Sequence, residues 1–205
     1  MLDRLALKLA SPFTGWGARR LHALGCRADQ VTLMGFALGL AGAGLIVLRH
    51  PLLALMLLAL SRIADGLDGA LARLCGPTDR GAFLDIALDF LFYAAVPLSF
   101  ALADPAANAL AAAVLLAAFM GTGTTFLAFS AIAAKRGLSS SAYPTKGIYY
   151  LGGLTEGTET LVCFLAMCLW PQHFAALAYL YASLCAVTTV TRLVAGWRVF
   201  TGENS

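Results

Sequence analysis

Four aspartates in two closely spaced pairs are the residues of this 205-residue chain best suited to chemistry. Asp65 and Asp68 are three residues apart, and Asp85 and Asp89 are four apart. On a helix, each spacing places both carboxylates on one face. At about 4 Å and an effective dielectric of roughly 20, each pair would repel by about 4 kcal/mol. Bound divalent cations would remove that repulsion, and oxygen ligands favour a hard ion such as Mg²⁺ or Mn²⁺. The aspartates therefore predict a site for one or two divalent ions.

Small residues and an arginine beside the first aspartate pair suit a phosphate-containing ligand. Gly69 and Ala72 remove side-chain bulk from the face that carries the carboxylates, which leaves room for a ligand beside the metal. Arg73 lies one turn beyond Gly69, and a guanidinium binds phosphate oxygens in a fork. A metal ion and an arginine are the groups that commonly bind and neutralise a diphosphate in a transfer reaction. The alternative is a structural set of salt bridges, in which Arg62 and Arg73 neutralise two aspartates and two carboxylates remain unpaired.

The composition places these charged residues in a membrane protein. The chain is 60% hydrophobic and 12% charged, with a mean hydropathy of +0.80, whereas a soluble domain carries about 25% charged residues. Ionisable groups at membrane depth are costly, so they indicate a functional site. Five cysteines form neither a CxxC pair nor a cluster with histidine, so the sequence supports neither a disulfide framework nor a zinc site.

The apolar runs predict six membrane-spanning helices, each long enough for a hydrocarbon core of about 30 Å. In chain order they cover residues 31–48, 52–74, 81–103, 108–134, 146–170 and 174–194. The preceding segment reads as one or two short amphipathic helices, broken near Ser11-Pro12 and lying on the membrane surface. Its alternative is a basic leader without defined structure. We therefore expect an all-α integral membrane fold. It is a single domain over residues 1–205, with an N-terminal amphipathic interfacial helix (1–27) and a six-transmembrane-helix bundle (28–198).

The basic residues favour one orientation of this bundle. The loops predicted for one side carry only Arg49, whereas ten basic residues fall on the other side: Arg4, Lys8, Arg19, Arg20, Arg27, Arg80, Lys135, Arg136, Lys146 and Arg198. By the positive-inside rule, both termini and the aspartate hairpin face the cytoplasm. In the first predicted span, Gly35 and Gly39 form a GxxxG motif. The motif predicts close helix packing inside the bundle, with a dimer face as the alternative.

The aspartate hairpin resembles the signature of the CDP-alcohol phosphotransferases (CDP-alcohol phosphatidyltransferases), integral membrane enzymes of phospholipid synthesis. The signature reads here Asp65-x2-Asp68-Gly69-x2-Ala72-Arg73-x7-Gly81-x3-Asp85-x3-Asp89. The six-span layout with an amphipathic N-terminus is also similar to that family. The resemblance implies a metal-dependent transferase of lipid metabolism, expected as a homodimer in a bacterial inner membrane.

The resemblance also implies a role for each residue of the signature. Asp65, Asp68 and Asp85 would be ligands of one or two Mg²⁺ or Mn²⁺ ions, and Asp89 would be the general base and a metal ligand as well. The residues implied to bind the CDP group are Thr32, Asp29, Gly69, Arg73, Gly81 and Thr78 or its neighbour Asp79. The implied reaction is attack of an alcohol on the lipid-bearing phosphorus of CDP-diacylglycerol, with release of CMP.

Two other classes of protein also place aspartates in membranes. A transporter that passes a cation would need charged groups near mid-membrane and internal repeat symmetry, which the sequence does not show. An intramembrane prenyltransferase also uses aspartate pairs with Mg²⁺, but those enzymes resemble a longer bundle with two separated aspartate-rich motifs. The enzyme interpretation is therefore preferred.

The sequence is less informative about the acceptor alcohol. Six residues near the cytoplasmic ends of the later spans are candidates for its pocket: Lys135, Arg136, Lys146, Glu156, Glu159 and Arg192. The basic residues suit a phosphorylated acceptor, and their alternative is topology and headgroup contact. The two glutamates suit a hydroxyl-rich acceptor or an ammonium group, and their alternative is pairing with the basic residues. Glycerol 3-phosphate, phosphatidylglycerol, serine and inositol phosphate all remain open.

Overall fold

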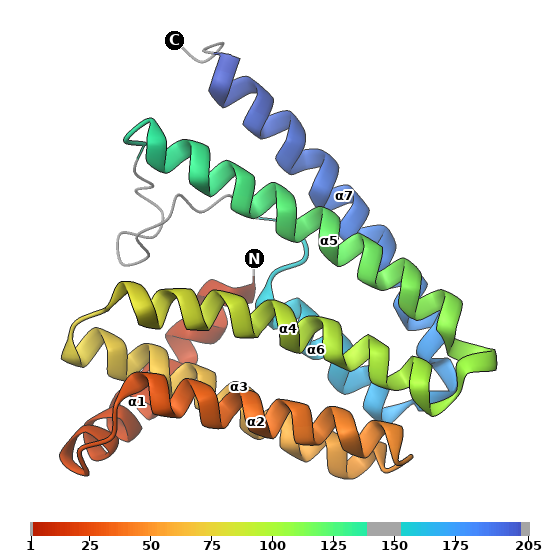
Figure 1. Cartoon of the computed structure of the whole chain (residues 1–205), viewed down its shortest axis with the longest axis horizontal. Coiled ribbons are helices and arrows are strands. Elements are labelled where there is room, and N and C mark those ends of the chain that lie inside the picture. Colours follow the sequence, from red (N-terminus) through yellow and green to blue (C-terminus); the bar gives the residue numbers. More distant parts are fainter. Residues whose placement is uncertain (1, 139–152, 202–205) are drawn as a thin grey trace.

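The structure, a computed structural model, describes residues 2–138 and 153–201, with side chains from residue 11 onward. Within these ranges the chain forms seven α-helices and one 3-10 helix (Figure 1). They are α1 (Leu2–Ala23), α2 (Ala28–Val47), α3 (Pro51–Cys75), α4 (Asp79–Ala103), α5 (Pro105–Lys135), α6 (Gly157–Leu169), η1 (Pro171–His173) and α7 (Phe174–Thr201). The predicted all-α fold is confirmed for this part of the chain.

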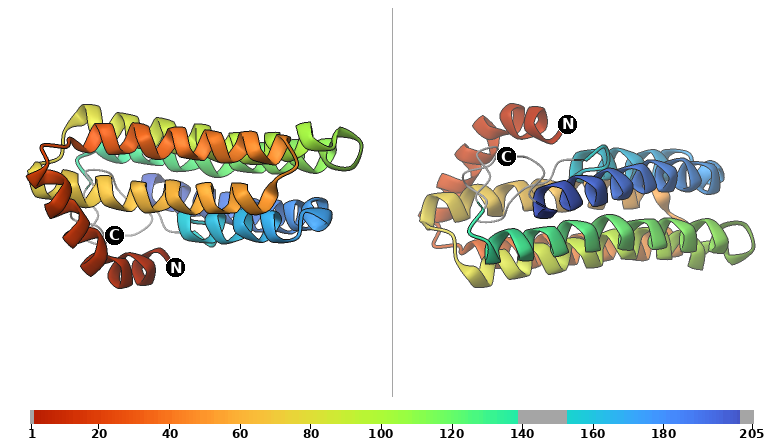
Figure 2. Two further views of the ribbon diagram at one scale, coloured as in Figure 1. Left: turned by 90° about the horizontal axis from the view of Figure 1, so that it is seen from below. Right: turned by 90° about the horizontal axis from the view of Figure 1, so that it is seen from above.

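The helices form two groups that diverge at one end of the molecule. α2 packs against both α3 and α4, whereas α5 packs against α4 and α7. α5 and α7 splay away from α4 toward the ends that carry Lys135 and Thr201 (Figures 1 and 2). The α3–α4 turn lies at this same end (Figure 1).

Among the described residues, four helical segments are long and apolar enough to cross a membrane: α2, α4, α5 and the continuous η1–α7 segment. α3 has 25 residues, but its second half carries Arg62, Asp65, Asp68 and Arg73, which keeps it out of that set. α6 has only 13 residues, and the first part of the fifth predicted span lies outside the described residues. Length and composition therefore support four spans, and the arrangement of six spans stays a prediction.

The N-terminal helix differs from its prediction in one respect. We expected a break near Ser11-Pro12, but α1 continues through Pro12, and its axis bends (Figure 2). A proline inside a helix removes one hydrogen bond and kinks the helix without having to end it. Ala18 is buried, and Gly17 lies so close to Leu67 that any side chain there would overlap it. α1 therefore packs against the charged half of α3, and its position at the membrane surface stays a prediction.

The GxxxG motif of α2 packs inside the bundle. A methyl group added at Gly35 would lie 3.0 Å from Cβ of Ala64 on α3. One added at Gly39 would lie 2.7 Å from Cδ2 of Phe92 on α4 and 3.0 Å from Oγ of Ser61 on α3. These glycines let α2 approach both neighbours, which confirms the packing interpretation of the motif.

We expect Gly39→Ala to lower the free energy of unfolding by about 1–3 kcal/mol, because overpacking a close contact displaces its neighbours. The measurement is thermal unfolding of the purified protein in detergent. Gly44→Ala is the matched control, since a Cβ at Gly44 would meet nothing within 4 Å and alanine favours a helix over glycine. Equal unfolding temperatures for the two variants would contradict the assigned packing.

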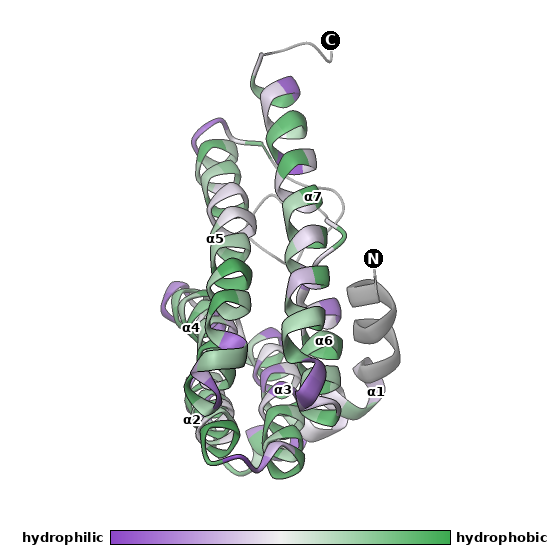
Figure 3. Cartoon of the chain, turned by 90° about the vertical axis from the view of Figure 1, so that its right-hand side faces the viewer, coloured by the Kyte–Doolittle hydropathy of each residue, from purple (hydrophilic) through white to green (hydrophobic). Residues whose placement is uncertain are grey.

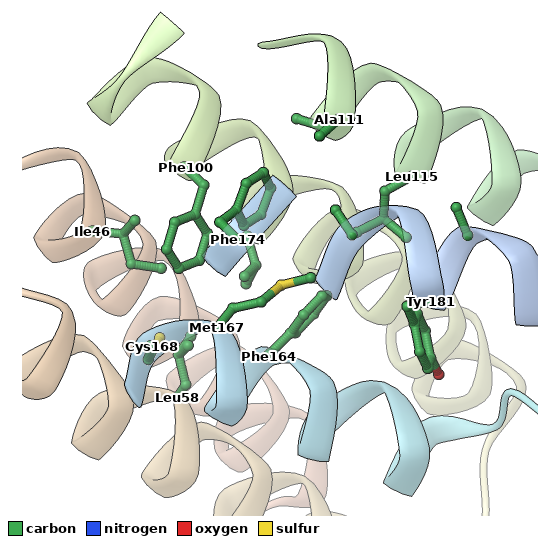
Figure 4. Close-up of a cluster of buried hydrophobic side chains, with 14 of the residues drawn as sticks. Ile46, Leu58, Phe100, Ala111, Leu115, Phe164, Met167, Cys168, Phe174 and Tyr181 are labelled. Carbon is green, nitrogen blue, oxygen red and sulfur yellow. The ribbon is translucent and has the colours of Figure 1, made fainter. Parts of the chain in front are cut away.

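An apolar core holds the helices together away from the charged half of α3 (Figure 4). The ring of Phe100 on α4 stacks on that of Phe174 on α7 with centroids 4.5 Å apart. Phe164 and Met167 bring α6 into the same core and are fully buried. The outer surfaces of the helices are also largely apolar (Figure 3), as expected for surfaces that face lipid.

Candidate active site

The two aspartate pairs face each other because of their positions on α3 and α4. Asp65 precedes the last residue of α3 by ten residues, and Asp89 follows the first residue of α4 by ten. At 1.5 Å per residue, both lie about 15 Å from the α3–α4 turn. Asp68 and Asp85 lie nearer, at about 10 Å. The antiparallel helices thus arrange the four carboxylates in a deep layer and a shallow layer.

A cavity between α2, α3 and α4 collects these side chains. Thr32, Gly35 and Phe36 of α2 line one side of it. Gly35 has no side chain, so α2 can approach α3 closely there. The residues that line the cavity are Thr32, Gly35, Phe36, Ser61, Arg62, Asp65, Asp68, Asp85, Leu88 and Asp89. All four predicted aspartates therefore contribute to one site.

Three of the four carboxylates form a tight cluster. Asp65, Asp68 and Asp85 each place one oxygen within 4.8 Å of the other two. Asp68 is only 4% exposed, and its Oδ2 atom is buried without a hydrogen-bond partner among the described residues. A buried carboxylate oxygen without a partner is costly, and such an atom calls for an explanation. A hard divalent cation would satisfy it, so the donor set fits the predicted metal.

Asp89 has a different partner, an arginine that the sequence analysis considered only as part of a structural salt-bridge set. Arg62 Nη1 lies 2.7 Å from Asp89 Oδ1 and 3.7 Å from Asp65 Oδ1. The guanidinium carbon stands 4.2 Å from the centroid of the Phe92 ring. Arg62 therefore joins the two deepest carboxylates, one from each helix. The signal in the sequence was its position three residues before Asp65, on the same helix face.

The residues predicted to contact the nucleotide lie near the start of α2 and around the α3–α4 turn. Thr32 lines the cavity, and its hydroxyl donates to the Ala28 carbonyl oxygen at 3.0 Å. Asp29 Oδ2 lies 2.5 Å from Arg80 Nη2, an ion pair that ties the start of α2 to the start of α4. Asp29 therefore has a structural partner, and a role in CDP binding would be additional to it.

The turn and the end of α3 complete the predicted nucleotide set. Thr78 caps α4, since its Oγ1 accepts a hydrogen bond from the Gly81 backbone at 3.1 Å. Arg73 is exposed in the last turn of α3, where its guanidinium is accessible to a phosphate. A methyl group at Gly69 would lie 3.4 Å from Arg73 Nη1, so the absence of a side chain there leaves the arginine room to move.

The comparison with known protein families decides the assignment of this site. A family model described as CDP-alcohol phosphatidyltransferase matches residues 26–193, which include every aspartate of the cavity. The chain belongs to this family. The resemblance seen in the aspartate spacing is thereby confirmed, and the protein is an enzyme of the phosphatidyltransferase class.

Two relatives of this CDP-alcohol phosphatidyltransferase match nearly all of its length and half of it, respectively. The chain is 49% identical to the inner membrane protein YnjF of Escherichia coli over 197 residues, which are 96% of each chain. It is 35% identical to the archaetidylinositol phosphate synthase of Pyrococcus horikoshii over 103 residues, or 50% of this chain and 54% of that protein. The apolar helices and the first relative indicate an integral protein of the inner membrane.

A solved structure shares the fold of this phosphatidyltransferase. The phosphatidylinositol phosphate synthase of Mycobacterium tuberculosis, crystallised with CDP-DAG bound, superposes with a TM-score of 0.72 and 25% identity. The match covers 90% of this chain and 93% of that one. A second structure of the synthase contains manganese and citrate. The manganese in that structure agrees with the carboxylate cluster described above.

The predicted acceptor residues of this phosphatidyltransferase fall into two separate places. Glu156 is buried, and its Oε1 accepts a hydrogen bond from the Gly153 backbone at 3.1 Å. Arg192 on α7 lies beside this segment, because a methyl group at Gly153 would meet its Nη2 at 3.2 Å. Arg192 Nη1 also donates to the Thr122 carbonyl oxygen at 3.0 Å. Glu159 is partly buried in the first turn of α6. Glu156 and Arg192 thus lie in one buried polar group where the start of α6 meets α5 and α7, and Glu159 lies one turn further along α6.

The other two described acceptor candidates lie elsewhere. Arg136 Nη1 donates to the carbonyl oxygen of Phe200 at 3.1 Å, and Phe200 follows Arg192 by eight residues, about 12 Å along α7. Lys135 is exposed beside it. The structure therefore separates Lys135 and Arg136 from the Glu156–Arg192 group, and Lys146 lies outside the described residues.

Proposed function

We propose that this protein transfers the phosphatidyl group of CDP-diacylglycerol to the hydroxyl of a small polar or lipid alcohol and releases CMP. The observation that carries the proposal is the cluster of Asp65, Asp68 and Asp85, with a buried and unpartnered Asp68 oxygen, on the signature of the family. The CDP-DAG bound in the mycobacterial synthase supports the choice of donor.

The four aspartates of the cavity have separate parts in the proposed mechanism. Asp65, Asp68 and Asp85 would hold one or two Mg²⁺ or Mn²⁺ ions, which would supply positive charge for the diphosphate. Asp89 takes the proton of the acceptor hydroxyl. The hydroxyl oxygen then bonds to the phosphorus that carries diacylglycerol, and the bond from that phosphorus to CMP breaks. That Asp89 is also a metal ligand, as first predicted, stays a prediction.

The shallow end of the cavity suits the nucleotide. Arg73 would bind the diphosphate, and its exposure at the end of α3 supports that role. Gly69 and Gly81 leave space for the nucleotide. Thr32, Thr78 and Asp29 would contact it from the starts of α2 and α4, and Thr32 lines the cavity itself.

We place this site on the cytoplasmic side, with both termini, in a homodimer of six-span, single-domain protomers (residues 1–205) whose N-terminal helix lies on the membrane surface. The basic residues beside the α3–α4 turn support the orientation. Cys75 at the exposed end of α3 offers a test. A membrane-impermeant maleimide should label it in inside-out vesicles and leave it unlabelled in spheroplasts. Mass measurement of the protein in native-like lipid tests the dimer, and a monomer would remove it.

The buried polar group at Glu156 and Arg192 is the better candidate for acceptor recognition. It brings negative and positive side chains together, which suits an acceptor that carries both hydroxyls and a phosphate. The inositol phosphate products in the names of two similar proteins make inositol phosphate the first acceptor to test. Lys135, Arg136 and Lys146 would then attract an anionic acceptor from the cytoplasm.

We expect Glu156→Gln and Glu159→Gln to raise the KM for the acceptor about tenfold, because a hydrogen bond to a charged group contributes about 1.5–3 kcal/mol. The KM for CDP-diacylglycerol should stay within about twofold of the wild-type value, since the proposed donor site is the aspartate cavity and neither glutamate lines it. Steady-state kinetics with both substrates varied is the measurement. Unchanged acceptor KM and acceptor selectivity in both variants would remove these glutamates from the pocket.

The function is tested by CMP release from CDP-diacylglycerol in detergent with Mg²⁺ or Mn²⁺, across a panel of acceptors. The panel contains inositol phosphate, glycerol 3-phosphate, serine and phosphatidylglycerol. We expect CMP release that depends on one of these alcohols and on the metal. No CMP with any acceptor, in protein that binds Mn²⁺ and is folded, would contradict the proposed function.

A further inference from the structure

We propose that Arg62 is a positioning residue of the transfer reaction, which orients Asp89 toward the acceptor and leaves Asp65, Asp68 and Asp85 as the metal site. This inference rests on the proposed function. It adds a residue that is not part of the aspartate signature and that lies one turn deeper on α3.

Arg62 makes its shortest carboxylate contact with Asp89, the aspartate outside the cluster of three. Arg62 Nη1 binds Asp89 Oδ1 at 2.7 Å, whereas its distance to Asp65 Oδ1 is 3.7 Å. The other oxygen of Asp89, Oδ2, makes no hydrogen bond with the described residues. One Asp89 oxygen is thus held by a charged donor, and the other can receive the proton of an alcohol. A fixed orientation is what a general base requires.

The charge of Arg62 also favours a metal site of three carboxylates. Four carboxylates in one cavity repel each other strongly, and Arg62 neutralises the one that stands outside the cluster of three. Asp65, Asp68 and Asp85 keep their oxygens within 4.8 Å of each other, and the unpartnered Asp68 Oδ2 belongs to this cluster. The short contact of the arginine is thus with the carboxylate outside the cluster, and its longer contact with Asp65 leaves the Asp68 oxygen to the predicted cation.

The surroundings of Arg62 hold the guanidinium in place. Its side chain is 14% exposed, it lies 4.2 Å from the centroid of the Phe92 ring, and Nη2 lies 3.4 Å from Ser61 Oγ. Phe92 and Ser61 both pack against Gly39 of α2, where an added methyl group would lie 2.7 Å from Phe92 and 3.0 Å from Ser61. The close packing of α2 therefore determines where the guanidinium stands, as expected for a residue that orients another.

The test compares Arg62→Gln and Arg62→Lys with the wild type in the CMP-release assay. Removing a residue that orients a functional group typically costs about 10- to 100-fold. We expect Arg62→Gln to lower kcat by that factor, with the KM for CDP-diacylglycerol within about twofold of wild type. Lysine keeps the positive charge but lacks the planar guanidinium with its several donors. Arg62→Lys should therefore recover most of the kcat that Arg62→Gln loses. Arg49→Gln is the matched control, because Arg49 binds the Ala103 carbonyl oxygen at the opposite end of α3, and its kcat should be unchanged.

Two further readouts separate positioning from a structural role. Mn²⁺ binding, measured by electron paramagnetic resonance without substrate, should be as tight in Arg62→Gln as in the wild type, because the cluster of three carboxylates is intact. In an Asp89→Asn background, Arg62→Gln should cause no further loss of kcat, since the arginine acts through Asp89.

The outcomes are distinct. No CMP release by the wild type overturns the proposed function and this inference with it. An active wild type with full kcat in Arg62→Gln overturns the role of Arg62 alone. If Arg62→Gln and Arg62→Lys both lose Mn²⁺ binding, or if the loss of kcat in Arg62→Gln adds to that of Asp89→Asn, Arg62 is a structural residue and the inference is also overturned. If Arg62→Gln does not fold, Arg62→Lys decides. A kcat about 3- to 10-fold below that of the wild type, with unchanged Mn²⁺ binding, supports positioning. A kcat equal to that of the wild type, or a loss of kcat that is just as large in the Asp89→Asn background, opposes it.

Discussion

Asp89→Asn is expected to lower kcat for CMP release by about 10²- to 10⁴-fold, the usual contribution of a general base. Asparagine has nearly the same shape as aspartate and can still accept a hydrogen bond from Arg62 at Oδ1. We therefore expect the cavity to stay assembled and the KM for CDP-diacylglycerol to change little. The measurement is steady-state CMP release with saturating acceptor.

Asp104→Asn is the matched control for this substitution. Asp104 caps α5 through a hydrogen bond from the Ala107 backbone, at the end of α4 remote from the cavity, and asparagine caps helices equally well. Its kcat should equal that of the wild type. Wild-type kcat in Asp89→Asn would contradict the assignment of the base.

Asp68→Asn is expected to weaken Mn²⁺ binding by at least about 10- to 100-fold and to reduce CMP release in parallel. Asp68 is the most buried of the cluster, and its Oδ2 atom has no hydrogen-bond partner among the described residues. The amide would remove one negative charge and place an N–H group against the cation. Titration of Mn²⁺ by electron paramagnetic resonance measures the binding separately from catalysis.

Removal of the metal tests the same site in the wild-type protein. A chelator should abolish CMP release by the wild type, and either Mg²⁺ or Mn²⁺ should restore it. Asp104→Asn should bind Mn²⁺ like the wild type. Tight Mn²⁺ binding by Asp68→Asn, together with activity that a chelator does not affect, would contradict the metal site.

The sequence was sufficient to predict the carboxylate cluster because helix geometry is regular. Spacings of three and four residues place side chains on one face, and a short turn between two helices brings those faces to matching depths. Asp65 and Asp89 lie ten residues from the ends of their helices that meet at the turn. No information beyond the chain was needed for this prediction.

The contact of Arg62 with Asp89 could not be predicted in the same way. Its spacing from Asp65 was visible, but the contact that matters crosses from α3 to α4. That contact depends on Phe92 and Ser61, and hence on how closely α2 packs at Gly39. Tertiary packing of this kind has no periodic signal in a single sequence. The ion pair between Asp29 and Arg80 was missed for the same reason.

The acceptor residues show a further limit of sequence patterns. A count of basic residues near predicted helix ends joined Arg136 and Arg192 in one pocket. α5 and α7 diverge from α4 at this end (Figure 1), and Arg136 contacts the last turn of α7 at Phe200, about 12 Å along that helix from Arg192. The buried group at Glu156 depends on the turn before α6, which pairs Thr155 with Thr188 at 3.0 Å. The direction of such a turn is set by packing and not by composition.

The most direct test follows the lipid-bearing phosphorus of CDP-diacylglycerol. The donor is labelled at that phosphorus and incubated with the wild type, metal and the active acceptor, and all products are resolved by mass. We predict one CMP for each new lipid, with the label retained in the lipid and joined to the acceptor hydroxyl. Labelled phosphatidic acid formed at the same rate without any acceptor, or release of CDP in place of CMP, would contradict phosphatidyl transfer by this site.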